Sequence, residues 1–129
     1  MSENYSAKIV KVYGKDLTTK DRIAVKNTSD AIKLDRETQE NGAVAISVDY
    51  FAELAIHSEK ADPQDYSQYV IVDKDGTKYV TGSPSFWSTF MDIYDEVQDA
   101  EDIDDFAIKV YRMPSRNREG KDFLTCTII

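Results

Sequence analysis

The pattern of hydrophobic and polar positions predicts a strand at the start of this chain. Residues 7–13, AKIVKVY, are the first strand candidate. Because successive side chains of a strand point to opposite faces, Ile9, Lys11 and Tyr13 share one face, and the other face carries Lys8, Val10 and Val12. Gly14 follows directly and ends the run.

Two short runs of β-prone residues come next, at residues 22–26 and 31–34. The segment between them, NTSD, has the composition of a turn. We therefore expect a hairpin here. The polar segment DRETQENG separates it from the next apolar run.

The longest apolar run, AVAISVDYFAELAIH at residues 43–57, fits two kinds of element. Its small and β-branched beginning favours a strand. Tyr50, Leu54 and His57 also recur at helical spacing, so a helix from Asp49 remains the alternative. Polar residues with Pro63 predict a loop over residues 58–67.

The second half of the chain gives clearer patterns. Residues 68–73 and 78–81 flank an Asp-Gly turn, which predicts a hairpin because glycine adopts positive φ at low cost. A helix is predicted directly afterwards, with Ser83 as N-cap and Pro84 as its first residue. Its apolar stripe consists of Phe86, Phe90, Ile93, Tyr94 and Val97. Aromatic rings at this spacing, and Trp87 beside them, are typical of a protein core.

Two strands close the chain, at residues 106–112 and 121–129, around a polar loop. The order of elements predicts a mainly β chain with one α-helix (α+β), arranged as an OB-fold-like antiparallel barrel with added strands. We expect a single domain over residues 1–129. In such a barrel the loop that joins the last two strands, here residues 113–121, contacts single-stranded nucleic acids and oligosaccharides.

Composition narrows the class of protein. The chain has 129 residues, of which 41% are hydrophobic and 31% are charged. That balance predicts a folded, soluble domain. The one cysteine, Cys126, excludes an internal disulfide, and no apolar run reaches the length of a membrane span. We expect a cytoplasmic protein without membrane contact.

Charge is distributed unevenly along the sequence. The net charge is -8 for the whole chain but +3 for residues 1–34, -14 for residues 35–105 and +3 for residues 106–129. Because both ends are basic, one positive face on an acidic body is predicted if the end strands lie together. Phosphate binding by an acidic protein needs such a face.

Candidate nucleic-acid contacts follow from this pattern. Lys11 and Tyr13 lie two residues apart on the first strand, and Lys109 and Tyr111 repeat the arrangement near the end. A cation beside an aromatic ring suits single-stranded DNA, whose phosphates need charge and whose bases stack on rings. The basic residues of the last strands complete the predicted set because guanidinium groups match phosphate oxygens. They are Arg112, Arg116, Arg118 and Lys121.

Residues for catalysis or metal binding are scarce. His57 is the only histidine and has no recognisable partner motif. The DKDG segment resembles the start of a calcium loop, but the later ligands of such a loop are absent. We therefore expect no enzyme activity, no metal and no cofactor.

Two segments, YVTGSPSFWSTFMDIYDE and IKVYRMPSRNREGKDFLTC, resemble small phage-encoded proteins of Gram-positive hosts. Some of these are single-stranded DNA-binding proteins of replication modules. The resemblance implies an OB-type fold and single-strand binding during phage replication or recombination in the bacterial cytoplasm. It implies contacts from Tyr111, Arg112, Arg116, Arg118 and Lys121. Many single-strand-binding proteins carry an acidic tail that recruits partners, whereas this chain ends in LTCTII.

An alternative function rests on the acidic residues 92–105. They predict either a solvated helix face or a surface that engages replication or host proteins. In the second case the chain is a phage-encoded protein-interaction module, or an inhibitor of a host nucleic-acid-binding protein. Edge strands also leave homodimerisation open.

Overall fold

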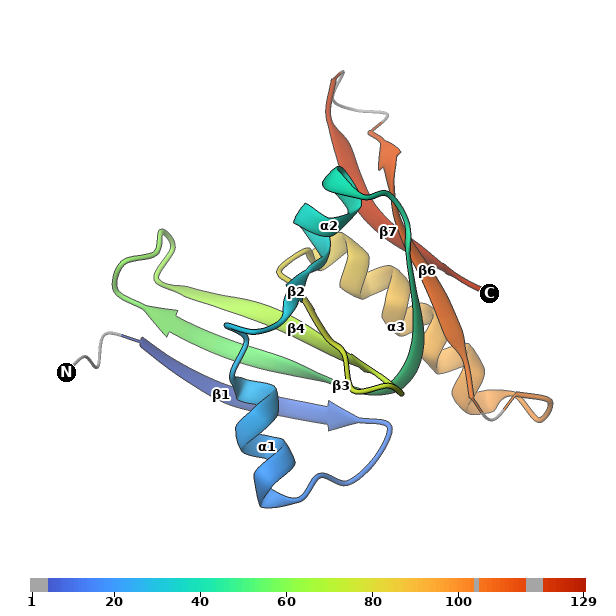
Figure 1. The fold of residues 1–129 in the computed structure, drawn as a ribbon, viewed down its shortest axis with the longest axis horizontal. Helices are drawn as coiled ribbons and strands as arrows, with labels where there is room; N and C mark the ends of the chain where they lie inside the picture. Colours follow the sequence, from blue (N-terminus) through green and yellow to red (C-terminus); the bar gives the residue numbers. More distant parts are fainter. Residues whose placement is uncertain (1–4, 104, 116–119) are drawn as a thin grey trace. The chain divides into compact units, whose positions relative to one another are not determined.

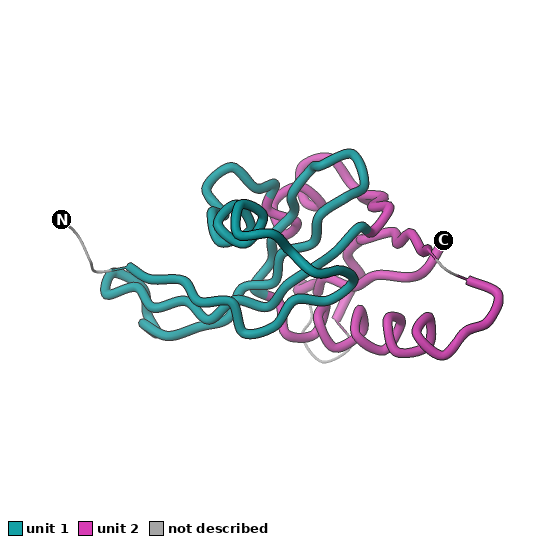
Figure 2. The backbone as a smooth tube through the Cα atoms, turned by 90° about the horizontal axis from the view of Figure 1, so that it is seen from below, with its two compact units in different colours: residues 1–32, 49–82 teal, residues 33–48, 83–129 magenta. Residues whose placement is uncertain are grey.

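The computed structural model describes residues 5–103, 105–115 and 120–129 (Figure 1). Its contacts divide the chain into two compact units, each built from two separate stretches. Unit 1 comprises Met1–Ile32 and Asp49–Gly82, and unit 2 comprises Lys33–Val48 and Ser83–Ile129 (Figure 2). The long strand β3 (Val44–Ser58) passes from unit 2 into unit 1 between Val48 and Asp49.

The described residues form seven strands and three α-helices. The prediction of a mainly β chain is therefore confirmed. The prediction of one α-helix is wrong, because two additional helices lie between the first strand and β3. The predicted barrel-like β class fits in part. Within the described ranges, no helix combines the length and hydrophobicity that crossing a bilayer requires.

Unit 1 contains an antiparallel sheet in the strand order β5-β4-β3-β1. Its elements are β1 (Tyr5–Tyr13), α1 (Thr19–Lys26), the second part of β3, β4 (Asp65–Asp73) and β5 (Lys78–Thr81). The predicted hairpin around the Asp-Gly turn is confirmed as β4 and β5, with Val70 opposite Val80. β4 begins at Asp65, inside the segment predicted as a loop.

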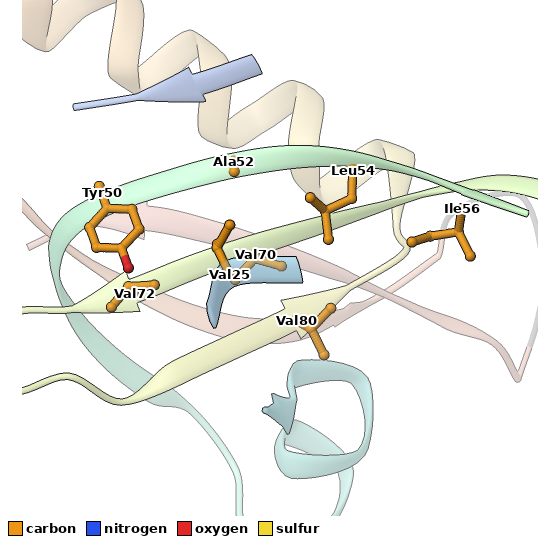
Figure 3. Packing of buried hydrophobic residues seen from close by; sticks show 8 residues of the cluster. All are labelled: Val25, Tyr50, Ala52, Leu54, Ile56, Val70, Val72 and Val80. Atoms are coloured by element: carbon orange, nitrogen blue, oxygen red, sulfur yellow. The ribbon is translucent and has the colours of Figure 1, made fainter. Parts of the chain in front are cut away.

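The core of unit 1 lies between this sheet and α1. Alternate residues of β3 and β4 point toward Val25 of α1, which is fully buried (Figure 3). Each buried aliphatic side chain of this size contributes about 2 kcal/mol through removal of apolar surface from water. The cluster consists of Val25, Tyr50, Ala52, Leu54, Ile56, Val70, Val72 and Val80.

β3 confirms the strand prediction for residues 43–57 and excludes the helix from Asp49. Every second residue from Ile46 to Ile56 is buried, which is the period of a strand. Tyr50 and Leu54 lie four residues apart, a spacing that fits both a helix face and a strand face, whereas His57 lies on the other face of β3.

β1 contains a bulge that changes its predicted faces. The register with β3 shifts between Ile9 and Lys11, so that Val10 is an extra residue and is 57% exposed. Ile9 and Val12 both pack against the core of unit 1. The prediction that Ile9 shares a face with Lys11 is therefore wrong, because a bulge reverses the alternation beyond it.

Residues 22–26, predicted as a strand, belong to helix α1. The Thr18 Oγ1 atom accepts a hydrogen bond from the backbone N–H of Asp21 at 3.2 Å, which caps the first turn. At the other end the Lys78 ammonium donates to the carbonyl oxygens of Ala24 and Asn27, both at 2.7 Å. The predicted hairpin is wrong because this cap and the burial of Val25 outweigh the weak β propensity.

Residues 31–34, the other half of that hairpin, also differ from the prediction. They contain only the two-residue strand β2 (Ile32–Lys33) and the first residue of helix α2 (Leu34–Glu40). Leu34 is fully buried, and the Thr38 hydroxyl donates to the Leu34 carbonyl at 2.8 Å. A helix with one apolar anchor leaves no periodic stripe in the sequence.

Unit 2 contains an antiparallel sheet in the order β3-β6-β7. Its elements are α2, the first part of β3, α3 (Pro84–Asp99), β6 (Ala107–Pro114) and β7 (Asp122–Ile128). The two predicted terminal strands are confirmed as β6 and β7. α3 runs alongside this hairpin, and α2 contacts β6 (Figure 1).

α3 is the helix predicted from the sequence, with the predicted cap. The Ser83 Oγ atom accepts a hydrogen bond from the Phe86 backbone N–H at 3.2 Å, and Pro84 is the first helical residue. Phe86 and Phe90 are fully buried with centroids 5.9 Å apart, so their prediction as core residues is confirmed. Trp87 is half-buried and stacks on Phe90 at 5.6 Å.

Candidate nucleic-acid interface

The β6–β7 hairpin has two chemically different faces. Ile108 and Val110 are fully buried, and Cys126 lies opposite Val110 on the same side. The other side is formed by the alternating residues of both strands. We call it the hairpin solvent face, and it comprises Lys109, Tyr111, Met113, Phe123 and Thr127. Thr125, opposite Tyr111, also lies on this side but is only 9% exposed.

Lys109 and Tyr111 form a preassembled pair on the hairpin solvent face. The Lys109 ammonium lies 5.3 Å from the centroid of the Tyr111 ring. Such a cation–π contact contributes about 0.5 to 1 kcal/mol at an exposed site. Lys109 lies opposite Ala45 on β3 and Thr127 on β7, which are both neutral. Its charge therefore faces solvent without a carboxylate directly across the sheet.

Phe123 and Met113 add apolar surface to the same face. They are directly opposite each other across the hairpin, and 38% and 43% of their surfaces are exposed. Phe123 also lies diagonally across from Tyr111, within reach of an aromatic side chain. Phe123 was not among the contacts predicted from the sequence. The alternation of β7 places Phe123 on the same face as Thr125. Only the register of β6 with β7, however, shows that this is also the face of Tyr111.

The tip of the hairpin carries an open depression of about 510 Å³. Its lining includes Met113, Lys121 and the stretches of chain next to them, and the Ser115 N–H donates to the Lys121 carbonyl at 2.9 Å. Lys121 is exposed there. Arg116 and Arg118, the other predicted contacts of this loop, lie outside the described residues.

Arg112 lies on the opposite side of β6 from Tyr111 and is engaged in ion pairs. Its guanidinium donates to Asp122 at 2.6 Å and lies 4.0 Å from the Asp35 carboxylate. The hydrogen bond from Arg112 lowers the pKa of the Asp122 carboxyl. Arg112 thus connects β6 to β7 and to α2, and its charge is largely neutralised there.

The first predicted pair, Lys11 and Tyr13, belongs to unit 1, whereas Lys109 and Tyr111 belong to unit 2. The Lys11 ammonium lies 4.9 Å from the Tyr13 ring centroid, so these two side chains share a face as predicted. Tyr13 also stacks on Phe51 at 4.9 Å, and Glu53 lies directly opposite Lys11. The ring is therefore partly used by the protein, and a carboxylate across the sheet weakens the attraction of Lys11 for phosphate.

His57 has a partner that the sequence did not reveal. Its Nδ1 atom lies 2.8 Å from a carboxylate oxygen of Asp65 on the neighbouring strand. This pair is exposed, in a depression that also includes Lys8. Among the described residues, no group of three or more histidine, cysteine or acidic side chains could hold a metal ion.

The carboxylates of the DKDG turn hold its backbone. The Asp73 side chain accepts from the Asp75 N–H at 3.0 Å, and Asp75 accepts from the Thr77 N–H at 2.8 Å. Gly76 has a φ of 94°. The turn chemistry therefore accounts for both aspartates.

Comparisons of the chain with protein-family models, with curated proteins and with solved structures find no match. The choice among functions therefore depends on the side chains that the fold presents.

Proposed function

We propose that this protein binds single-stranded DNA without catalysing a reaction, and that the hairpin solvent face is the principal contact. The observation that carries the proposal is the Lys109–Tyr111 cation–π pair beside the exposed Phe123 ring. Charge and flat apolar surface are thereby combined on one open antiparallel hairpin.

The physical fit is to unpaired bases. A base that stacks on an aromatic ring contributes about 1 to 3 kcal/mol, and both faces of a base are accessible only in a single strand. Tyr111 and Phe123 supply two rings on neighbouring strands. Lys109 and Lys121 supply charge for the phosphates between the stacked bases.

The acidity of the protein supports a confined site. With a net charge of -8, most of the surface repels DNA, whereas residues 106–129 carry +3. Each phosphate contact releases counterions, so the binding constant falls as salt rises. Arg116 and Arg118 extend the proposed contacts of the hairpin, and Lys11 and Tyr13 are a separate proposed contact on unit 1. The proposed setting is phage replication or recombination in the cytoplasm of a bacterial host.

Fluorescence anisotropy of a labelled oligothymidine, titrated with the full chain at several salt concentrations, tests the proposal. We expect Tyr111→Ala and Phe123→Ala to weaken binding by about 1 kcal/mol or more each. Ile23→Ala is the matched apolar control, because Ile23 is 66% exposed on α1 of unit 1. Circular dichroism of each variant checks that the fold is retained.

Charge variants test the phosphate contacts separately. Lys109→Ala and Lys121→Ala should each reduce the slope of log K against log salt by about 1. Lys20→Ala, which removes one exposed charge from α1, should leave the slope nearly unchanged. Absence of binding at low salt would refute the proposal. Equal losses in the control variants would place the site elsewhere.

A further inference from the structure

A groove in unit 2 combines an apolar floor with an acidic rim. It has a volume of about 470 Å³ and is formed by the second half of α3, the segment after it and the end of β7. The floor consists of Ile93, Val97, Ala100, Ile103 and Ile128, and the rim consists of Asp92 and Glu96.

Part of the groove floor is open to solvent. Ile128 is 40% exposed and Ile93 and Ile103 are half-buried, whereas Val97 is only 8% exposed. Ile93, Val97 and the C-cap residue Ala100 follow one another at intervals of four and three, so these apolar residues lie along one face at the end of the helix. Open aliphatic strips of this kind accept the apolar face of another segment.

The charge around the groove indicates that its ligand is positively charged. The last turn of α3 contains no basic residue, although the carboxyl end of a helix favours cations. Asp92, Asp95, Glu96 and Asp99 are instead exposed along this half of the helix. The helix dipole and the carboxylates therefore add up to a negative potential beside an apolar strip, and a cationic ligand relieves both.

We propose that this groove docks a short amphipathic segment of a partner protein, with apolar side chains at helical spacing flanked by Lys or Arg. The aliphatic side chains occupy the floor, and the basic side chains reach the carboxylates of Asp92 and Glu96. DNA is excluded by the sign of the charge. This inference is independent of DNA binding by the hairpin solvent face.

Selection from a displayed library of random 15-residue peptides against the full chain tests the proposal. We expect enrichment of peptides that carry aliphatic residues at intervals of three or four, flanked by Lys or Arg. The position of the enriched peptide is then mapped by NMR chemical-shift changes, which should centre on Ile93, Val97 and Ile128. Enrichment of acidic or purely apolar peptides, or shift changes elsewhere, would overturn the proposal.

Paired charge variants make the test specific. Asp92→Asn with Glu96→Gln should weaken the enriched peptide about fivefold, because two exposed ion pairs are lost. Asp95→Asn with Asp99→Asn removes the same charge from the same helix outside the groove lining and should have a smaller effect. Equal losses of peptide affinity in both variants would indicate general electrostatic attraction and refute a specific contact with Asp92 and Glu96. Ile128→Thr, which keeps a β-branched residue in β7, should also weaken the peptide.

Two further readouts distinguish a partner segment from DNA and from a second copy of the chain as the occupant of the groove. Oligothymidine affinity should not fall in the Asp92→Asn/Glu96→Gln variant, since that site lies outside the hairpin solvent face. Sedimentation of the chain alone should show no self-association through the groove, that is, none that the Ile128→Thr substitution removes. Such self-association would assign the groove to a second copy and overturn the proposal.

Discussion

Cys126 illustrates how burial controls the chemistry of a single residue. Its side chain is 5% exposed on the buried side of the β6–β7 hairpin, and burial raises the pKa of the thiol to about 12. At pH 8 the native thiol is therefore protonated, whereas a free cysteine with a pKa of about 8.5 is partly thiolate.

We predict that Cys126 reacts with DTNB only when the protein unfolds. Under native conditions at pH 8 the reaction should be slower than in guanidinium chloride by orders of magnitude, because the thiolate is the reacting species. Absorbance of the released thionitrobenzoate measures the rate. Rapid stoichiometric reaction of the native chain would contradict the burial of Cys126.

The carboxyl groups of Asp30 and Asp122 make the stability of the protein depend on pH in the acid range. A hydrogen bond from Lys78 lowers the pKa of Asp30, and one from Arg112 lowers the pKa of Asp122. Each contribution is present above the unfolded pKa of about 3.9 and is lost as pH falls through the lower folded pKa. The free energy of unfolding should therefore decrease below about pH 4. Urea titrations should show a smaller decrease in Asp122→Asn.

Among the elements, helix α1 depends on a side chain from another part of unit 1. The Lys78 ammonium on β5 donates to two carbonyls at the end of α1 and to the Asp30 carboxylate at 3.0 Å. Only 14% of the Lys78 side chain is exposed. This contact supplies a charged donor to the carbonyls at the end of α1, of which Ala24 also accepts from the Asn27 N–H at 3.1 Å.

Lys78→Met should therefore destabilise the protein. Loss of hydrogen bonds from a charged donor costs about 2 kcal/mol, while the methionine retains the aliphatic stem. Chemical denaturation followed by circular dichroism measures the change. Lys60→Met, at an exposed position outside the helices and strands, is the control and should be close to neutral. Equal stability of the two variants would show that Lys78 does not hold α1.

The sequence predicted those elements whose signals are local. The Asp-Gly turn gave the β4–β5 hairpin, and Ser83 with its apolar stripe gave α3. α1 and α2 were not predicted, because each is short and has few buried apolar side chains to form a stripe. The bulge at Val10 could not be predicted from the sequence either, because it depends on the pairing of β1 with β3.

The candidate site was partly predictable for the same reason. Alternation alone placed Lys109 and Tyr111 on one face, and the structure brings them into contact. Phe123 required the register of β6 with β7. The ion pairs of Arg112 required the position of Asp35, which lies 77 residues earlier in the sequence.

At the scale of the whole molecule, the two units are interleaved in sequence. Unit 2 takes α2 and the first part of β3 from Lys33–Val48 and the rest from Ser83–Ile129. Within it, β6 pairs with residues Val44 to Ser47 of β3. The C-terminal stretch alone therefore lacks one of its three strands and one of its two helices.

We predict that a fragment of residues 83–129 does not fold by itself. Its amides in β6 should exchange with solvent as in an unfolded chain, measured by NMR in deuterium oxide. A fragment of residues 33–129 retains both stretches of unit 2 and is the control. We expect slower exchange in β6 there. Equal exchange in the two fragments would show that β3 does not stabilise the hairpin.

The interleaving also constrains how the chain is made. During synthesis from the N-terminus, all residues of unit 1 have been added at residue 82, before β6 and β7 exist. Leu34, Ile46 and Val48 are buried in the folded protein. The second stretch of unit 2, residues 83–129, is synthesised only after them. The growing chain therefore passes through a period in which the first part of β3 is an unpaired apolar strand. That period is when the protein is most exposed to aggregation and most in need of a chaperone.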